Sequence, residues 1–121
     1  MKDLSLNDII KDIVKLADDK KAEQISVFNV AEQHWLTEFI VVVGVNNSVH
    51  SRAVSEELKH YFSQLGDHKD LYPTPHSIGD SESGWVIIDA NSIIVHCVNE
   101  STRQFYDIDK LFAAQGEIYY Y

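Results

Sequence analysis

An unbroken run of apolar, largely β-branched residues at positions 39–43 constrains the fold of this chain more than any other feature. The run begins at Phe39, ends at Val43 and is followed by Gly44. A strand with one side in water alternates apolar and polar residues, whereas this run offers apolar side chains to both of its sides. It therefore predicts a central strand in a sheet that is covered on both faces.

Helical patterns lie on both sides of this run. Apolar residues at helical spacing predict an amphipathic helix over residues 5–19, begun by Ser5 in a capping box. A second apolar stripe predicts a helix over residues 49–65, with Ser48 as its N-cap and Gly66 at its C-terminal end. Both helices have the apolar side that packing against a sheet requires.

The remaining strands are expected mostly in the second half of the chain. Residues 85–89 and 93–98 predict a hairpin, whose turn at Asn91 needs a residue that tolerates positive φ. A first strand is expected over residues 25–30, and a short strand is an option at 70–72 within a loop-rich stretch. Residues 100–112 predict one or two short helices. This order of elements predicts an α/β fold, a mixed β-sheet flanked by helices.

The charge balance restricts the class of partner. The chain has 19 acidic and 10 basic residues, a formal net charge of −9, and no cluster of basic residues larger than the pair Lys20-Lys21. Phosphate backbones repel such a chain, so no direct nucleic-acid partner is expected, and a basic protein partner is favoured. The chain has one cysteine, no apolar run long enough to span a membrane and no signal-peptide pattern. These features favour a soluble cytoplasmic protein without membrane contact.

Metal and cysteine chemistry are not indicated. The six histidines lack the short spacings of a zinc site, and the best pair, His68 and His76, shares only a loop. Cys97 follows His96 directly, and neighbours on a strand point to opposite faces, so they cannot form a catalytic dyad. A buried, unreactive Cys97 is expected. No nucleotide fingerprint is present, and no cofactor or metal is predicted.

An enzymatic alternative stays open at this point. A small nucleotidyltransferase-like enzyme would use Glu38 and Asp89 as its carboxylates and the loop after Gly44 to hold phosphate. The Asp107-Ile108-Asp109 motif is expected on a short helix rather than on a strand, so the usual second carboxylate is missing.

Several side chains near the hairpin admit two interpretations. Trp85 is either a residue at the edge of the core or an anchor for a partner, and Asp89 either caps the hairpin turn or carries charge for binding. Arg103 and Tyr106 share a helical face, and they either tie the last helix to the sheet or contact a partner. His96 is expected to be hydrogen-bonded within the sheet, and Leu111 and Phe112 are expected in the core.

One set of residues keeps a characteristic spacing within segment 84–112: Trp85, Asp89, Val95, His96, Glu100, Arg103, Tyr106, Asp107, Lys110 and Leu111. This segment resembles the C-terminal block of a known family, the Iojap-like ribosomal silencing factors. Thr37-Glu38-Phe39 is similar to the Thr-Asp-aromatic motif of the same family. The resemblance implies a nucleotidyltransferase-like core without the catalytic carboxylates. It implies a single domain over residues 1–112, with residues 113–121 as an aromatic tail.

The resemblance also implies a function without catalysis. Members of this family bind the large ribosomal subunit through a basic ribosomal protein, the fourteenth of the large-subunit series, and sterically block subunit joining, which represses translation. The partner-binding residues expected on this basis are Trp85, Asp89, Glu38, Arg103 and Tyr106. A third interpretation, a homodimer or larger homo-oligomer of the free chain joined through the tail, stays open.

Overall fold

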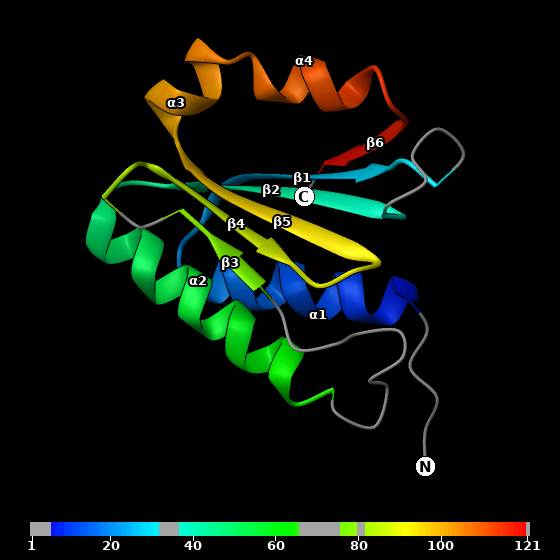
Figure 1. The fold of residues 1–121 in the computed structure, drawn as a ribbon, viewed down its shortest axis with the longest axis horizontal. Coiled ribbons are helices and arrows are strands. Elements are labelled where there is room, and N and C mark those ends of the chain that lie inside the picture. Colours follow the sequence, from blue (N-terminus) through cyan, green and yellow to red (C-terminus); the bar gives the residue numbers. More distant parts are fainter. Residues whose placement is uncertain (1–5, 32–36, 66–75, 80–81, 121) are drawn as a thin grey trace.

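A six-stranded mixed sheet forms the centre of the fold (Figure 1). The computed structural model describes residues 6–31, 37–65, 76–79 and 82–120. The strands are β1 (Glu23–Asn29), β2 (Phe39–Val45), β3 (His76–Ile78), β4 (Trp85–Asp89), β5 (Ile93–Asn99) and β6 (Glu117–Tyr120), in the order β3-β4-β5-β2-β1-β6. β2 and β5 are parallel, and the other paired neighbours are antiparallel.

Helices cover both faces of the sheet. The longer ones, α1 (Leu6–Asp19) and α2 (Ser48–Ser63), lie on one face, and the short helices α3 (Glu100–Phe105) and α4 (Ile108–Ala113) lie on the other (Figure 1). The predicted α/β architecture, a mixed sheet flanked by helices, is therefore confirmed.

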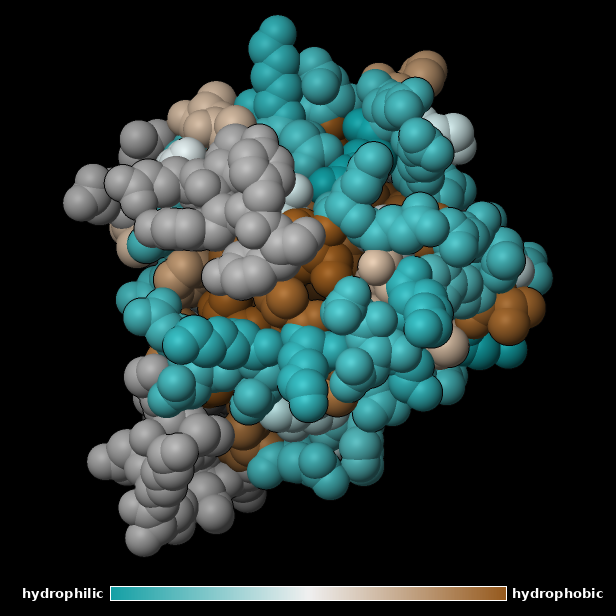
Figure 2. Space-filling model, turned by 180° about the vertical axis from the view of Figure 1, so that it is seen from behind, coloured by the Kyte–Doolittle hydropathy of each residue, from teal (hydrophilic) through white to brown (hydrophobic). Residues whose placement is uncertain are grey.

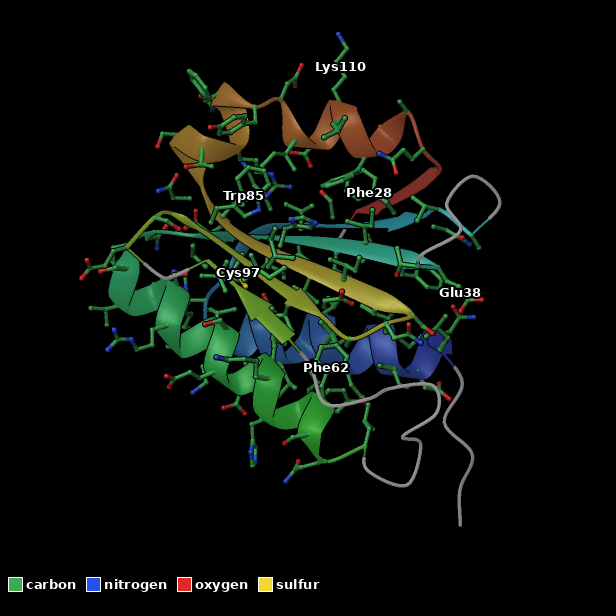
Figure 3. The ribbon with its side chains drawn as sticks, in the orientation of Figure 1. Phe28, Glu38, Phe62, Trp85, Cys97 and Lys110 are labelled. Atoms are coloured by element: carbon green, nitrogen blue, oxygen red, sulfur yellow. The ribbon has the colours of Figure 1, made fainter. Side chains whose placement is uncertain are left out.

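The apolar run that begins β2 divides its side chains between two cores. Val41 and Val43 pack on the α1 and α2 side, whereas Ile40 and Val42 pack on the α3 and α4 side. Figure 3 shows the same division in Phe62 and Phe28, which lie on opposite faces of the sheet. β2 has neighbours on both edges, so the prediction of a central strand covered on both faces is confirmed.

The start of α2 differs from its prediction by one residue. Asn47 is the N-cap: its backbone is extended, and its side-chain oxygen accepts a hydrogen bond from the His50 N–H at 2.9 Å. Ser48 is the first helical residue, so its prediction as N-cap was wrong, because an asparagine one position earlier already supplies the acceptor. The predictions for Ser5, Gly66 and residues 70–72 fall outside the described residues.

The hairpin of β4 and β5 has the predicted turn. Asn91 adopts a φ of 69°, and its backbone N–H donates to the Asp89 Oδ1 at 3.0 Å. This hydrogen bond is the turn-capping contact that one interpretation of Asp89 required.

Replacing Asn91 tests how much this turn depends on left-handed backbone. Asn91→Ala is expected to lower the free energy of unfolding by about 1 kcal/mol, because alanine is strained at positive φ. Asn91→Gly, the matched control, relieves that strain and is expected to cost less. Urea unfolding of the three proteins measures the difference, and equal losses in both variants would contradict this account of the turn.

The C-terminal segment belongs to the sheet. β6 pairs with β1 in antiparallel register, from Ser26 opposite Tyr120 to Asn29 opposite Glu117. A Cβ atom at Gly116 would collide with the carbonyl group of Asn29, so the chain can approach β1 this closely only with glycine. Residues 117–120, which the sequence analysis placed in a tail after residue 112, therefore extend the sheet by one strand.

The surface is mostly hydrophilic. Seen from behind, hydrophilic residues make up most of the described surface, and a hollowed apolar area is visible near its centre (Figure 2). In the part of the chain that the structure describes, no helix has the length and apolar character needed to cross a membrane.

Candidate partner-binding surface

Trp85 begins β4 on the face of the sheet that α3 and α4 cover. Gly84 precedes it with a φ of 82°, and a Cβ atom there would meet the side chain of Asn99, so the strand starts beside the N-cap of α3. The indole of Trp85 is half-buried, and its centroid lies 5.3 Å from the ring of Tyr106. Trp85 is thus both a wall of the smaller core and part of the surface near α3.

His96 holds the indole of Trp85 in place. The Trp85 Nε1–H donates to the His96 Nδ1 at 2.9 Å, and the imidazole centroid lies 4.9 Å from the ring of Phe112. Burial lowers the pKa of His96 from 6.5 to about 4, because an imidazolium would lose its hydration there. The ring is therefore neutral near pH 7 and accepts the indole hydrogen bond, which confirms the prediction of a hydrogen-bonded histidine within the sheet.

The depressed pKa of His96 links stability to pH. The unfolded chain takes up a proton at this histidine near pH 6.5, whereas the folded chain takes it up near pH 4, so stability is expected to fall as pH falls through this window. One proton gives a slope of at most about 1.4 kcal/mol per pH unit. His96→Gln keeps an acceptor for the indole but does not titrate. Urea unfolding between pH 7 and 4 should show a flatter profile for this variant, and parallel profiles would exclude His96 as the cause.

Two aromatic side chains next to Trp85 project into solvent. Phe105 is 81% exposed and Tyr106 is 56% exposed, and their rings meet edge to face at 4.9 Å. Leu111 on α4 is 54% exposed as well. We call Trp85, Phe105, Tyr106 and Leu111 the α3–α4 surface. Apolar side chains this exposed are typical of surfaces that bind a partner.

Leu111 and Phe105 depart from the sequence analysis. Leu111 was predicted in the core, and this was wrong: the short helix α4 turns Ile108 and Phe112, four residues apart, towards the sheet, so Leu111 faces away. The prediction for Phe112 is confirmed. Phe105 was not selected from the sequence, although its position beside Tyr106 at the end of a short helix was a usable signal.

Two exposed carboxylates lie on the segment that carries this surface. They belong to Glu100 and Asp107, whereas Lys110 is the exposed basic residue of the described segment 100–113. The excess of acidic groups at this place agrees in sign with the net charge of −9. The α3–α4 surface thus combines aromatic groups with negative charge.

Arg103 points inward rather than toward this surface. It is 6% exposed, and its Nε and Nη2 donate to the two carboxylate oxygens of Asp109 at 2.6 and 2.7 Å. Nη2 also donates to the Ser26 Oγ at 3.1 Å. Hydrogen bonding to this guanidinium lowers the pKa of Asp109. Arg103 therefore ties α3 to α4 and to β1, the structural interpretation of the two that the sequence allowed.

Glu38 and Asp89 lie away from the other predicted site residues. The Glu38 N–H donates to the Ser92 carbonyl at 3.0 Å, which places Glu38 beside the hairpin turn that Asp89 caps. Figure 3 shows Glu38 and Trp85 at opposite ends of the sheet. Four residue steps along β4 separate Trp85 from Asp89, about 13 Å. The five predicted residues thus form two groups, one at each end of the sheet.

The same geometry separates the parts of the enzymatic alternative. Glu38 precedes β2 and Gly44 lies near its end, so about 20 Å of strand separates the carboxylate from the loop proposed to hold phosphate. Among the described residues, no three histidine, cysteine, aspartate or glutamate side chains gather closely enough for a metal site. Cys97 is fully buried, which confirms the predicted burial, and this burial raises its pKa to about 12, so the nucleophilic thiolate is disfavoured.

Comparison with known sequences gives one consistent family. The model of the family described as "Ribosomal silencing factor during starvation" matches residues 3–119. The chain is 27% identical over 110 residues to the ribosomal silencing factor RsfS of Halalkalibacterium halodurans, covering 90% of this chain and 89% of that protein. It is 28% identical over 111 residues to RsfS of Treponema pallidum, covering 90% and 94%. These relatives are named as silencing factors and not as enzymes.

Solved structures share the fold. A crystal structure of a protein from Chromobacterium violaceum superposes with a TM-score of 0.76 at 20% identity, covering 94% of this chain and 89% of that one. A crystal structure of a protein from Bacillus halodurans gives a TM-score of 0.72 at 25% identity, covering 87% and 93%. With a family match that spans nearly the whole chain, including most of β6, the resemblance seen in residues 84–112 is confirmed: this chain belongs to the ribosomal silencing factor family.

Proposed function

We propose that this chain represses translation by binding the large ribosomal subunit and preventing the small subunit from joining it. Membership of the silencing-factor family supports a role at the ribosome. The arrangement of Glu38, Asp89 and Gly44 offers no single place for phosphate chemistry, so the proposal needs no catalytic step. The chain acts by occupying space that the small subunit needs.

The proposed partner on the large subunit is a basic protein, the fourteenth of the large-subunit series. Ribosomal RNA repels a chain with a net charge of −9, so attachment through a protein surface is electrostatically preferred over attachment through RNA. Opposite charge on the partner also speeds encounter, because long-range attraction guides the two surfaces together.

The proposed contact is the α3–α4 surface. The observation that carries the proposal is the pair of exposed aromatic rings, Phe105 and Tyr106, on a segment that also exposes two carboxylates. Trp85 packs against the ring of Tyr106. Aromatic residues dominate the binding energy of many protein interfaces, and basic side chains of a partner can pair with the exposed carboxylates. Trp85 then acts as a half-buried support for the rings that make the contact.

Glu38 and Asp89 are proposed as a second, peripheral contact. They lie at the other end of the sheet, about 13 Å or more from Trp85 along β4. An interface of ordinary size covers about 800 Å² on each partner, which is wide enough to reach both groups. Arg103 contributes indirectly in this proposal, because it fixes the helices that carry Phe105 and Tyr106.

Sedimentation with purified ribosomal subunits tests the proposal. The chain is expected to migrate with large subunits on a sucrose gradient and to stay at the top of the gradient with small subunits alone. Migration with neither subunit, or equally with both, would contradict specific docking on the large subunit.

A further inference from the structure

A small cavity of about 120 Å³ lies at the carboxyl end of β2. Its lining includes residues from three elements: Glu23 and Gln24 at the start of β1, Gly44 near the end of β2, and Glu100 and Arg103 of α3. We call it the β2-end cavity. Its walls come from three elements that the fold brings together, so no local motif in the sequence describes it.

Arg103 presents an unused donor to this cavity. Nε and Nη2 are occupied by Asp109 and Ser26, but Nη1 is buried and has no hydrogen-bond partner among the described residues. A Cβ atom at Gly44 would lie 3.6 Å from Nη1, so the missing side chain of this glycine leaves space beside the nitrogen at the cavity wall. Buried donors are almost always paired, so a donor that no described residue pairs is a place where the acceptor atom of a ligand can bind.

The backbone around the cavity is irregular. Gln24 adopts a φ of 49°, which is rare for a residue with a side chain, and the pairing of β1 with β2 shifts register between Glu23 and Ser26. A Cβ atom at Gly44 would lie 2.6 Å from the Glu23 carbonyl oxygen, so the two strands approach closely here only because residue 44 is glycine. Bulges and left-handed residues gather at binding sites, where they shape a wall that a regular strand cannot form.

The charges around the cavity select the class of ligand. Glu23 and Glu100 are exposed acids on its rim, and together with the net charge of −9 they repel a simple anion. A simple cation would meet the guanidinium of Arg103 instead. A ligand with a carboxylate at one end and an ammonium group at the other suits both charges. Its carboxylate accepts hydrogen bonds from Arg103 inside the cavity, and its ammonium group donates to Glu23 and Glu100 at the rim.

We propose that the β2-end cavity binds a free α-amino acid with a small side chain. One carboxylate oxygen accepts from Arg103 Nη1, and the ammonium group faces Glu23 and Glu100 at the rim. The cavity is smaller than the pockets that hold drug-sized ligands, which restricts the ligand to a few heavy atoms. Binding involves no covalent step.

Titration of the whole chain with L-alanine, followed by ¹H–¹⁵N NMR, tests this site. The amide signals of Gly44 and Gln24 are expected to shift and to saturate. N-acetyl-L-alanine lacks the ammonium group and L-alaninamide lacks the carboxylate, and each is expected to bind at least about tenfold more weakly, because each loses a charge-assisted hydrogen bond. Absence of a saturable shift would overturn the proposal.

Two variants and one further probe sharpen the test. Glu100→Gln is expected to weaken L-alanine binding about tenfold, whereas Glu82→Gln, a matched change in a neighbouring hollow, should leave it unchanged. Equal weakening by both variants, or tighter binding of inorganic phosphate than of L-alanine, would also overturn the proposal. The titration uses the chain without ribosomes, so its outcome is independent of docking on the large subunit.

Discussion

Asp109→Ala is expected to lower the free energy of unfolding by about 3 kcal/mol, because it leaves the buried guanidinium of Arg103 without its counter-charge. The value lies at the lower end for a broken buried pair, since the Asp109 side chain is 39% exposed and water partly replaces it. The change would loosen α3 and α4 together, since Arg103 connects both helices to β1.

Urea unfolding at pH 7 measures this loss, and two comparisons make it specific. Glu56→Ala removes an exposed carboxylate from α2 and is expected to change stability by less than about 0.5 kcal/mol. Asp109→Asn keeps an acceptor for the guanidinium and should fall between the wild type and Asp109→Ala. A loss for Asp109→Ala no larger than that for Glu56→Ala would mean that the pair does not hold the helices.

The lowered pKa of Asp109 places its contribution in a different pH range from that of His96. A carboxylate whose pKa is lowered on folding stabilises the fold above its unfolded pKa of 3.8, and this stabilisation is lost as pH falls below that value. The histidine effect lies higher, between about pH 6.5 and 4. The free energy of unfolding of Asp109→Ala, measured against pH, should therefore lack the loss that Asp109 contributes below pH 3.8. It should keep the loss that His96 contributes between about pH 6.5 and 4.

Phe105→Ala and Tyr106→Ala are each expected to weaken binding to the large subunit by about 30-fold, the loss of about 2 kcal/mol that marks a residue central to an interface. Both rings are mostly exposed in the free chain, so the changes should leave the fold intact. Binding curves from co-sedimentation at several subunit concentrations measure the loss.

Val49→Ala is the matched control for these two variants. Val49 is 78% exposed on α2, which covers the opposite face of the sheet, so the same kind of truncation removes apolar surface far from the proposed contact. It should bind like the wild type. A loss in Val49→Ala equal to that in Phe105→Ala would contradict a contact confined to the α3–α4 surface.

The sheet and its covering helices were predictable because their signals are local. The apolar run at 39–43 predicts a central strand, helical spacing predicts α1 and α2, and the polar turn at Asn91 predicts the hairpin. Each signal is carried by a few consecutive residues whose burial follows from strand or helix periodicity. The structure shifts their bounds by one or two residues and leaves their nature unchanged.

The features that the sequence misjudged or left undecided depend on contacts between distant parts of the chain. The strand β6 pairs beside β1, which lies about ninety residues earlier in the chain, and nothing local to residues 117–120 indicates this pairing. Arg103 reaches Ser26 across 77 positions, so its inward direction could not be read from a helical face alone. Leu111 faces solvent because the short helix α4 buries only one face, which Ile108 and Phe112 occupy.

The division of the predicted site was, by contrast, derivable from the sequence. Once residues 85–89 are assigned to one strand, Trp85 and Asp89 share a face but are separated by the length of that strand. An interface that includes both Trp85 and Asp89 must be wide, whereas a compact interface must be centred on α3. The exposure of Phe105 and Tyr106 favours α3 as its centre.

Subunit association followed by light scattering tests the central claim most directly. Large subunits preincubated with the wild-type chain are expected to join small subunits poorly, whereas those preincubated with the double variant Phe105→Ala, Tyr106→Ala should join normally. Normal joining while the wild-type chain remains bound to the large subunit would contradict silencing by exclusion, and equal inhibition by the double variant would contradict docking through the α3–α4 surface.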